Sequence, residues 1–219
     1  MKKIKINDFI KLEYTARIKN TNEIFDLTSE ELAKKEGIFN KEINYGPKII
    51  CVGQKEILSE LDNFLINKEL NKGYKIELSP EQTFGNRNNK LIKTLNTQNL
   101  LKQKINPYPG MQLNLGNLMG IIRSVTNGRT LIDFNHPLAG KVLSYELKII
   151  EIIEDPKLKL ESLLKNTLNV ELELEINEKT AIIYLELPKT TEEKLKDLIK
   201  KLIPELENIV FQKKRTKNN

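Results

Sequence analysis

The chain has few residues of the kinds that bind metals or form disulfides. Its 219 residues include one cysteine, Cys51, and one histidine, His136. A single cysteine cannot form an intramolecular disulfide, and one Cys with one His cannot supply the ligands of a structural zinc or iron–sulfur site. Cys51 lies in the apolar run 49–52, which predicts a buried, inert thiol. We therefore expect no metal, no cofactor and a reducing, cytoplasmic environment.

Long apolar runs are also missing. Residues 1–14 alternate between apolar and polar side chains, so they predict neither a signal peptide nor a membrane span. With 39% hydrophobic and 30% charged residues, the composition is that of a globular protein with its own core. We expect no membrane partner.

Acidic residues are absent from one internal stretch. Residues 82–132 contain no Asp or Glu, and they carry seven basic residues: Arg87, Lys90, Lys93, Lys102, Lys104, Arg123 and Arg129. This stretch therefore carries a charge of +7, against a net charge of +6 for the whole chain, which leaves −1 elsewhere. The excess positive charge belongs to one segment of the protein.

The apolar pattern predicts alternating strands and short helices. Strands are expected over residues 4–19, 24–26, 48–52, 74–78, 111–115, 118–125, 129–134, 142–153, 170–176, 180–187 and 209–212. Helices are expected over residues 28–36, from about 55 to 65, over 157–166 and over 190–206, and Thr28 and Thr190 fit capping boxes with Glu31 and Glu193. The pattern changes after Asp155-Pro156, which predicts a domain boundary, and the basic tail from residue 213 is expected to be frayed.

Five motifs occur in a familiar order. LEY (12–14), IFD (24–26), VGQKEIL (52–58) and SPEQTFG (79–85) resemble the successive motifs of FKBP-type peptidyl-prolyl isomerases. DFNHPLAGK (133–141) resembles the signature loop of the SlyD-like branch, whose flap carries an inserted chaperone domain. The resemblance covers about the first 155 residues. The helix over 28–36 and the region after residue 155 resemble the long archaeal members, which end in an additional α/β domain.

The resemblance implies an α+β fold: an FKBP-like antiparallel half-barrel sheet around a short helix, with an inserted small β-rich domain and a C-terminal α/β domain. The implied domains are an isomerase domain over 1–85 and 133–155, an insert-in-flap chaperone domain over 86–132, and a C-terminal domain over 156–219. The implied activity is peptidyl-prolyl cis–trans isomerisation and chaperoning of unfolded or nascent polypeptides.

The resemblance also implies a proline pocket. Its lining would be formed by Tyr14, Phe25, Asp26, Ile57, Leu58, Leu61, Phe84, His136 and Tyr145. Two positions depart from the family pattern. Phe84 replaces a tyrosine whose hydroxyl bonds a substrate carbonyl, and Leu61 replaces an aromatic pocket floor. Both changes bear on catalytic efficiency and on macrolide binding more than on the fold.

Several alternatives stay open. His136 either satisfies backbone groups of its turn or borders the pocket, or does both. The acid-free segment is a solvated basic surface, a client-binding chaperone surface or a nucleic-acid site. Tyr108 is the only aromatic residue of the insertion over 86–132, which disfavours a stacking platform. Client binding would use the segment's apolar residues Met111, Leu113, Leu115, Leu118, Met119, Ile121 and Ile122.

Two rival functions follow from these alternatives. One is a holdase chaperone with weak catalysis because of Phe84, and the other is a ribosome- or RNA-associated binding factor. The stripe Leu195, Leu198, Ile199, Leu202, Ile203 and Leu206 is expected to pack on the C-terminal ribbon, where homodimerisation is plausible. The sequence does not specify the clients, the residue preferred before proline or the oligomeric state.

Overall fold

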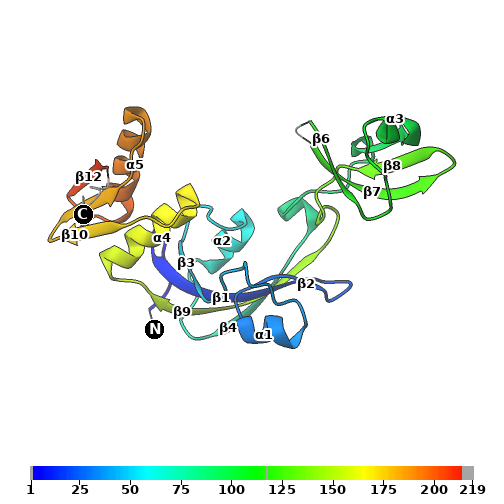
Figure 1. The fold of residues 1–219 in the computed structure, drawn as a ribbon. Coiled ribbons are helices and arrows are strands. Elements are labelled where there is room, and N and C mark those ends of the chain that lie inside the picture. The colour runs from blue at the N-terminus through cyan, green and yellow to red at the C-terminus, as the bar shows by residue number, and fades with distance from the viewer. Residues whose placement is uncertain (1, 117, 214–219) are drawn as a thin grey trace. The chain divides into compact units, whose positions relative to one another are not determined.

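The computed structural model describes residues 2–116 and 118–213 (Figure 1). The chain divides into two compact units. The first unit combines Met1–Glu77 with Ser144–Asn219, and the second is Leu78–Leu143. The tail was expected to be frayed from residue 213, and its residues after 213 lie outside the described part of the chain.

An antiparallel sheet forms the centre of the first unit. Its strands are β1 (Phe9–Ile18), β2 (Ile24–Leu27), β3 (Lys48–Cys51), β4 (Gly73–Leu78) and β9 (Leu143–Ile152). They are ordered β2-β1-β9-β4, and β3 also pairs with β1. Helix α2 (Ser59–Leu65) buries Leu61 and Leu65. Mixed helices and antiparallel sheets agree with the fold class expected from the sequence, and the strands predicted around these ranges are confirmed.

Two predicted helix starts in this unit are wrong. Helix α1 (Glu30–Lys35) is capped by Ser29, not by Thr28. Thr28 is buried, and its hydroxyl instead bonds both backbone groups of Tyr14 at 3.0 and 3.2 Å. Helix α2 begins at Ser59 rather than near Lys55, because Lys55 has a left-handed φ of 58° that no α-helix accepts.

The first unit ends in a smaller layer of helices and strands. Its elements are α4 (Pro156–Leu168), β10 (Leu174–Asn177), β11 (Thr180–Tyr184), α5 (Lys189–Leu202) and β12 (Asn208–Gln212). Strand β11 pairs antiparallel with β10 and parallel with β12. The predicted capping box at Thr190 is wrong, because the N-cap of α5 is Pro188 and makes no side-chain bond. Strand β10 also starts at Leu174, later than the alternation from 170 predicted.

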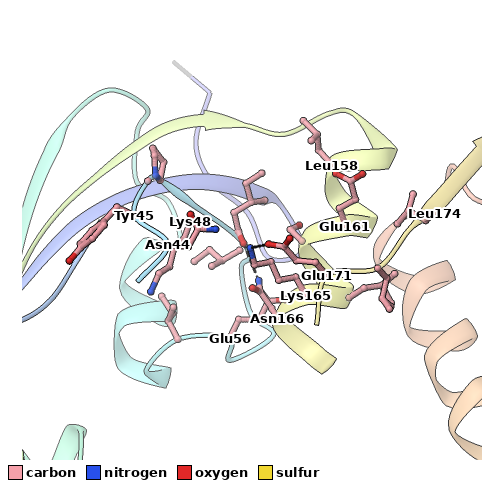
Figure 2. A pocket seen from close by; sticks show the side chains of 18 residues that line it. Asn44, Tyr45, Lys48, Glu56, Leu158, Glu161, Lys165, Asn166, Glu171 and Leu174 are labelled. Atoms are coloured by element: carbon pink, nitrogen blue, oxygen red, sulfur yellow. Dashed lines mark hydrogen bonds and ion pairs between the residues drawn. The ribbon is translucent and has the colours of Figure 1, made fainter. Parts of the chain in front are cut away.

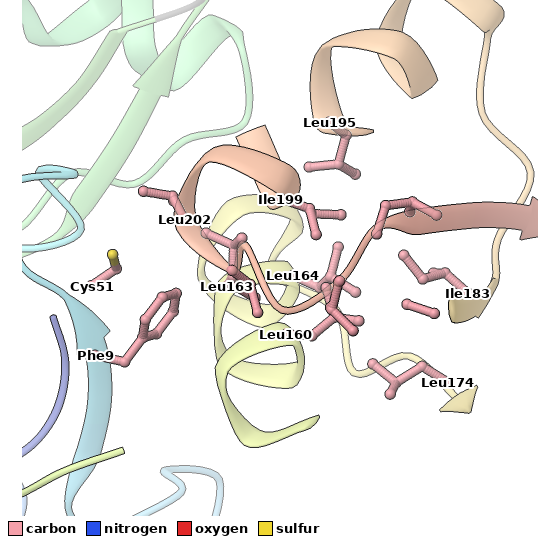
Figure 3. Close-up of a cluster of buried hydrophobic side chains, with 14 of the residues drawn as sticks. Phe9, Cys51, Leu160, Leu163, Leu164, Leu174, Ile183, Leu195, Ile199 and Leu202 are labelled. Carbon is pink, nitrogen blue, oxygen red and sulfur yellow. The ribbon is translucent and has the colours of Figure 1, made fainter. Parts of the chain in front are cut away.

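The apolar stripe of α5 packs as predicted. Leu195, Ile199 and Leu202 join α4 and β11 side chains in one buried cluster (Figure 3). Phe9 and Cys51 extend this cluster into the central sheet. Cys51 is 1% exposed, and burial raises the pKa of its thiol to about 12, so the prediction of a buried, inert cysteine is confirmed.

The second unit is a four-stranded sheet with one helix. Strands β5 (Ile92–Asn96), β6 (Gln112–Leu115), β7 (Leu118–Thr126) and β8 (Arg129–Asp133) are ordered β5-β8-β7-β6, and α3 (Thr97–Lys102) follows β5. The three later strands were predicted, but β5 and α3 were missed. The two apolar residues of β5, Ile92 and Leu95, are three positions apart, and those of α3 are adjacent, so neither segment shows its period. Leu100, Leu113, Ile122 and Ile132 form the buried core.

Gly120 on β7 marks the tightest packing in this core. A Cβ at this position would lie 2.7 Å from both Ile132 Cγ2 and Phe134 Cε1. We expect Gly120→Ala to lower the unfolding free energy of the second unit by about 1–3 kcal/mol, because the core must shift to admit the methyl group. Gly73→Ala, where nothing lies within 4 Å, is the control and should change stability by less than about 0.5 kcal/mol. Urea unfolding of both variants measures the difference, and equal stability would contradict the packing argument.

Candidate active site

Three aromatic side chains meet on adjacent strands of the first unit. Tyr14 lies on β1, Phe25 on β2 and Tyr145 on β9. The Phe25 and Tyr145 ring centroids are 5.9 Å apart in an edge-to-face arrangement, and those of Tyr14 and Tyr145 are 6.2 Å apart. Because β1 is bordered by β2 and β9, side chains of one face meet here although they are far apart in sequence. The result is a largely buried group of rings, since Tyr14 is 7% and Tyr145 5% exposed, and we call it the aromatic cluster.

A polar group adjoins the aromatic cluster. The Tyr14 hydroxyl donates a hydrogen bond to Asp26 Oδ2 at 2.7 Å and accepts one from Lys48 Nζ at 2.5 Å. Lys48 Nζ also lies 3.9 Å from Asp26 Oδ2. Asp26 therefore orients Tyr14 and balances Lys48, which fits an orienting role better than a proton-transfer role. Lys48 was not predicted as a site residue, because the only feature that marks it in the sequence is its place at the start of an apolar strand.

Both tyrosines are protonated at neutral pH. Burial, followed by the charge and hydrogen bond of Asp26, raises the pKa of Tyr14 well above its ordinary value. Burial, followed by the charge of Asp26, raises the pKa of Tyr145 to about 12. The cluster thus offers neutral phenols and an apolar surface, with no strong base among its aromatic members.

The turn before α2 carries the three aliphatic candidates. Asp62 is 3% exposed. Its carboxylate accepts hydrogen bonds of 2.9 Å from the backbone N–H groups of Gly53 and Lys55, and these bonds hold the turn in place. Ile57 and Leu58 are half-buried and Leu61 is buried on α2. Leu58 is the N-cap of α2, so its N–H lies outside the intrahelical hydrogen bonds. The anchoring role of Asp62 was not anticipated from the sequence.

Phe84 and His136 belong to the second unit, where they contact each other. Their rings stack with centroids 4.0 Å apart and planes 4° apart. His136 Nδ1 accepts the Leu138 N–H at 3.1 Å, so the histidine satisfies its own turn. The exposed imidazole also covers one face of Phe84, the position where the resemblance implies a tyrosine.

Asp133, the first residue of the DFNHPLAGK motif, is a buried anchor of the second unit. It is 1% exposed and pairs with Arg87 and with Arg123, whose Nη2 lies 3.0 Å away. Its Oδ1 accepts the Asn135 N–H at 3.0 Å and the Asn135 Nδ2 at 2.8 Å. The sequence indicated a constrained turn but not this charge network, because both arginines come from other segments.

The seven predicted client-binding residues divide by exposure. Leu118 is 57% exposed and Met119 62% exposed. Met111, Leu115 and Ile121 are half-buried. Leu113 and Ile122 are core residues, since alternate side chains of β6 and β7 face the interior, and they are therefore not accessible to a client in this structure.

Within residues 2–116 and 118–213, no helix is long and apolar enough to cross a membrane. In the same part of the chain, no three His, Cys, Asp or Glu side chains are grouped to hold a metal ion.

Comparison with known proteins finds relatives that are all named peptidyl-prolyl cis-trans isomerases. A family model described as "FKBP26, IF domain" matches residues 96–138. The short-type peptidyl-prolyl cis-trans isomerase of Methanocaldococcus jannaschii is 28% identical over 149 residues, covering 68% of this chain and 94% of the relative. The FKBP-type isomerase SlyD of Helicobacter pylori is 20% identical over 124 residues, covering 52% of this chain and 63% of SlyD.

The Escherichia coli FKBP-type 16 kDa peptidyl-prolyl cis-trans isomerase is 24% identical over 119 residues, covering 52% of this chain and 78% of that protein. These matches agree with the antiparallel sheet, the ordered motifs and the aromatic cluster described above. The chain is similar to FKBP-type peptidyl-prolyl cis-trans isomerases.

Proposed function

We propose that this protein catalyses cis–trans isomerisation of X–Pro bonds in unfolded or nascent polypeptides in the cytoplasm and assists their folding as a chaperone. The observation that carries the proposal is the aromatic cluster of Tyr14, Phe25 and Tyr145 beside Asp26. In this proposal, residues 1–85 and 133–155 form the isomerase domain and residues 86–132 an inserted chaperone domain. Residues 156–219 form a C-terminal α/β domain.

The chemistry needs neither a nucleophile nor a metal. Rotation about an X–Pro bond crosses a barrier of roughly 20 kcal/mol, because amide resonance is lost when the bond twists. The planar amide is more charge-separated than the twisted one, so an apolar aromatic surface disfavours the planar ground state relative to the transition state. The aromatic cluster provides such a surface.

The polar groups beside the cluster orient the substrate in this mechanism. In the proposed complex, the backbone N–H of Leu58, the N-cap residue of α2, donates a hydrogen bond to a carbonyl oxygen of the substrate. Asp26 holds the Tyr14 hydroxyl in place through the 2.7 Å hydrogen bond, so the ring is positioned before substrate arrives. Ile57 and Leu61 complete the part of the proposed proline pocket that lies in the first unit. Phe84 and His136, which lie in the second unit, are assigned to the site by the resemblance alone.

A refolding assay tests the proposal. With a protein whose refolding is limited by proline isomerisation, micromolar amounts of the full-length chain should accelerate the slow phase, which otherwise takes tens to hundreds of seconds. Phe25→Ala should reduce the acceleration by about tenfold or more, because it removes the edge of the aromatic cluster. No acceleration by the unaltered protein would rule out the isomerase.

Phe84 gives a gain-of-function prediction. Phe84→Tyr should raise kcat/KM for proline peptides by about 2–10-fold. The reason is that the added hydroxyl can donate one hydrogen bond to the substrate, and such a bond contributes about 0.5–1.5 kcal/mol. Phe211→Tyr on β12 is the matched control and should leave activity unchanged. A protease-coupled peptide assay measures both. If Phe84→Tyr has no effect, the missing hydroxyl does not limit the enzyme.

A holdase is the second candidate, favoured by the exposed apolar residues of the second unit. Leu118, Met119 and Tyr108 are all more than half exposed on this unit. Its eight basic residues against two acidic ones give it a net charge of +6, equal to that of the whole chain. Suppression of client aggregation without catalysis of refolding would favour the holdase over the isomerase.

The same charge favours a ribosome or RNA partner as a third candidate. Arg87 and Arg123 are paired with Asp133, which reduces the basic surface that nucleic acid would meet. Binding to RNA should weaken steeply with salt, and a salt-independent affinity would exclude an RNA partner.

A homodimer through the C-terminal layer stays part of the proposal. A monomeric mass by light scattering at high protein concentration would exclude the homodimer.

A further inference from the structure

A cavity lies in the first unit, and Lys48 lines it. It has a volume of about 670 Å³ and is lined by residues 44–50, by the turn before α2, by α4, and by Glu171, Leu172 and Leu174 (Figure 2). This volume is within the range of about 300–1,000 Å³ typical of ligand sites. The aromatic rings of Tyr14, Phe25 and Tyr145 do not line it, so the proposed chemistry leaves the cavity unexplained.

Glu56 lines this cavity and carries a carboxylate oxygen without a hydrogen-bond partner among the described residues. Its Oε2 accepts the Cys51 N–H at 3.1 Å and Asn166 Nδ2 at 2.6 Å. Its Oε1 is buried and has no hydrogen-bond partner among the described residues. Both donors are neutral, and burial raises the pKa of the carboxyl group above its ordinary value. A buried carboxylate without a cation is unfavourable, so the site gains free energy when a cation binds.

The other charges that line the cavity have partners. Glu171 pairs with Lys165 at 2.6 Å, and Glu161 lies 3.9 Å from Lys157. Lys48 is held by Asp26 and the Tyr14 hydroxyl. A cation that enters the cavity therefore finds its strongest uncompensated attraction at Glu56.

Apolar side chains form much of the remaining wall. Ile57, Leu158 and Leu172 line the cavity together with other aliphatic residues of β3 and α4. An aliphatic stem with a cationic head fits such a surface, because the stem covers apolar area while the head reaches the carboxylate. Lysine and arginine side chains have this chemistry.

The cavity shares residues with the proposed proline site. Ile57 and Lys48 line the cavity, and Ile57 also belongs to the predicted proline pocket while Lys48 bonds Tyr14. An extended polypeptide advances about 3.3–3.6 Å per residue. A client whose proline lies at the aromatic cluster thus brings a residue a few positions away to the cavity.

We propose that this cavity is a specificity subsite that binds a lysine or arginine side chain of the client polypeptide, a few residues from the X–Pro bond, with Glu56 as the counter-charge. The inference rests on the proposed isomerase function and names the client feature that this chain prefers. Glu56 is a specificity-determining residue in this proposal, since it contacts the client but not the rotating bond.

Calorimetric titration of the full-length chain with matched peptides tests the proposal. The reference peptide contains one proline flanked by neutral residues, and each of the four positions on either side is replaced in turn by lysine or by its uncharged isostere norleucine. At one position, lysine should bind about tenfold more tightly than norleucine, which corresponds to about 1.4 kcal/mol. A lysine advantage below about twofold at every position would overturn the proposal.

Two variants assign the effect to the cavity. Glu56→Gln removes the charge, and Leu158→Lys places a competing cation at a residue that is 40% exposed on α4. Either substitution should reduce the lysine advantage to less than about twofold, whereas Glu60→Gln, an exposed acid in the first turn of α2, should keep it. If Glu56→Gln does not fold, as judged by circular dichroism, Leu158→Lys decides. A lysine advantage that survives in a folded variant overturns the proposal.

The same titrations distinguish failure of the proposed subsite from failure of the proposed isomerase function. Binding and turnover of the norleucine peptides without any lysine preference would reject the subsite and keep the isomerase. Failure of every proline peptide to bind or to be turned over would reject both.

Discussion

Replacing Asp133 with asparagine is expected to destabilise the second unit by about 3 kcal/mol, at the lower end of the cost of removing one partner of a buried ion pair. Asp133 is 1% exposed and pairs with Arg87 and Arg123. Without the carboxylate, both guanidinium groups lose their counter-charge, and Asn135 loses a charged acceptor. The arginines are 45% and 43% exposed and can reach water, which moderates the cost.

Hydrogen exchange of the full-length chain measures this effect. Amides of β7 and β8 should lose protection in Asp133→Asn, because these strands carry or adjoin the network. Glu81→Gln is the matched control, as it removes the other acidic residue of the unit at an exposed position, and protection should be unchanged. Unchanged protection in Asp133→Asn would mean that the buried pairs contribute nothing to the stability of the unit.

Asp133 is also expected to make the stability of the second unit sensitive to acid. Burial opposes ionisation of Asp133, but hydrogen bonds from Asn135 and Arg123 and the charge of Arg87 hold the pKa of this carboxyl below its ordinary value. A group whose pKa is lower in the folded state contributes its full stability above its unfolded pKa of about 3.9 and loses it as the pH falls through the folded value. Protection of β7 and β8 should therefore fall below about pH 4 in the unaltered chain, and should change less with pH in Asp133→Asn.

Removing the acid-free insertion is expected to lower catalysis of protein refolding by about 100-fold while changing small-peptide turnover by less than about threefold. In the proposed division of labour, a client bound to the insertion would reach the proposed proline site at a high effective concentration, and the deletion would remove this tethering. The structure favours removal of residues 89–134, because Asn88 and Asn135 bond each other at 2.8 and 3.1 Å and a short glycine linker can join them.

A full-length variant separates client binding from the loss of a domain. Leu118→Glu combined with Met119→Glu changes two exposed apolar residues on β7 and should slow protein refolding catalysis without affecting peptide turnover. Gln112→Glu on β6 adds charge at an exposed polar position and is the control. Refolding and peptide assays run side by side give the comparison. Equal loss on both substrates would contradict a division of labour between the proline site and the insertion.

Much of the fold could be predicted from local pattern. The alternation around β1, β4, β7 and β9 predicted these strands, and the stripe of α5 predicted its buried face. These features are local because the periods of strands and helices are set by backbone geometry. Strand β5 and helix α3 were missed because their few apolar residues do not follow a strand or helix period.

The candidate site shows the limit of such reasoning. The ordered motifs supplied the residue types Tyr14, Phe25 and Asp26, and the resemblance supplied their expected role. Which groups they contact depended on strand pairing, since Lys48 reaches the Tyr14 hydroxyl only because β3 pairs with β1.

The sequence by itself determined the positions of most strands and helices, the confinement of positive charge to one segment and the chemical types at the proline site. The tertiary structure decided which distant charges meet: Asp133 with Arg87 and Arg123, and Glu56 with Asn166, which is 110 residues away. Periodicity specifies the face on which a side chain lies, but a contact between distant residues also requires the register and packing of both elements. Those are set by the whole core, and so the two buried carboxylates could not be assigned before the fold was known.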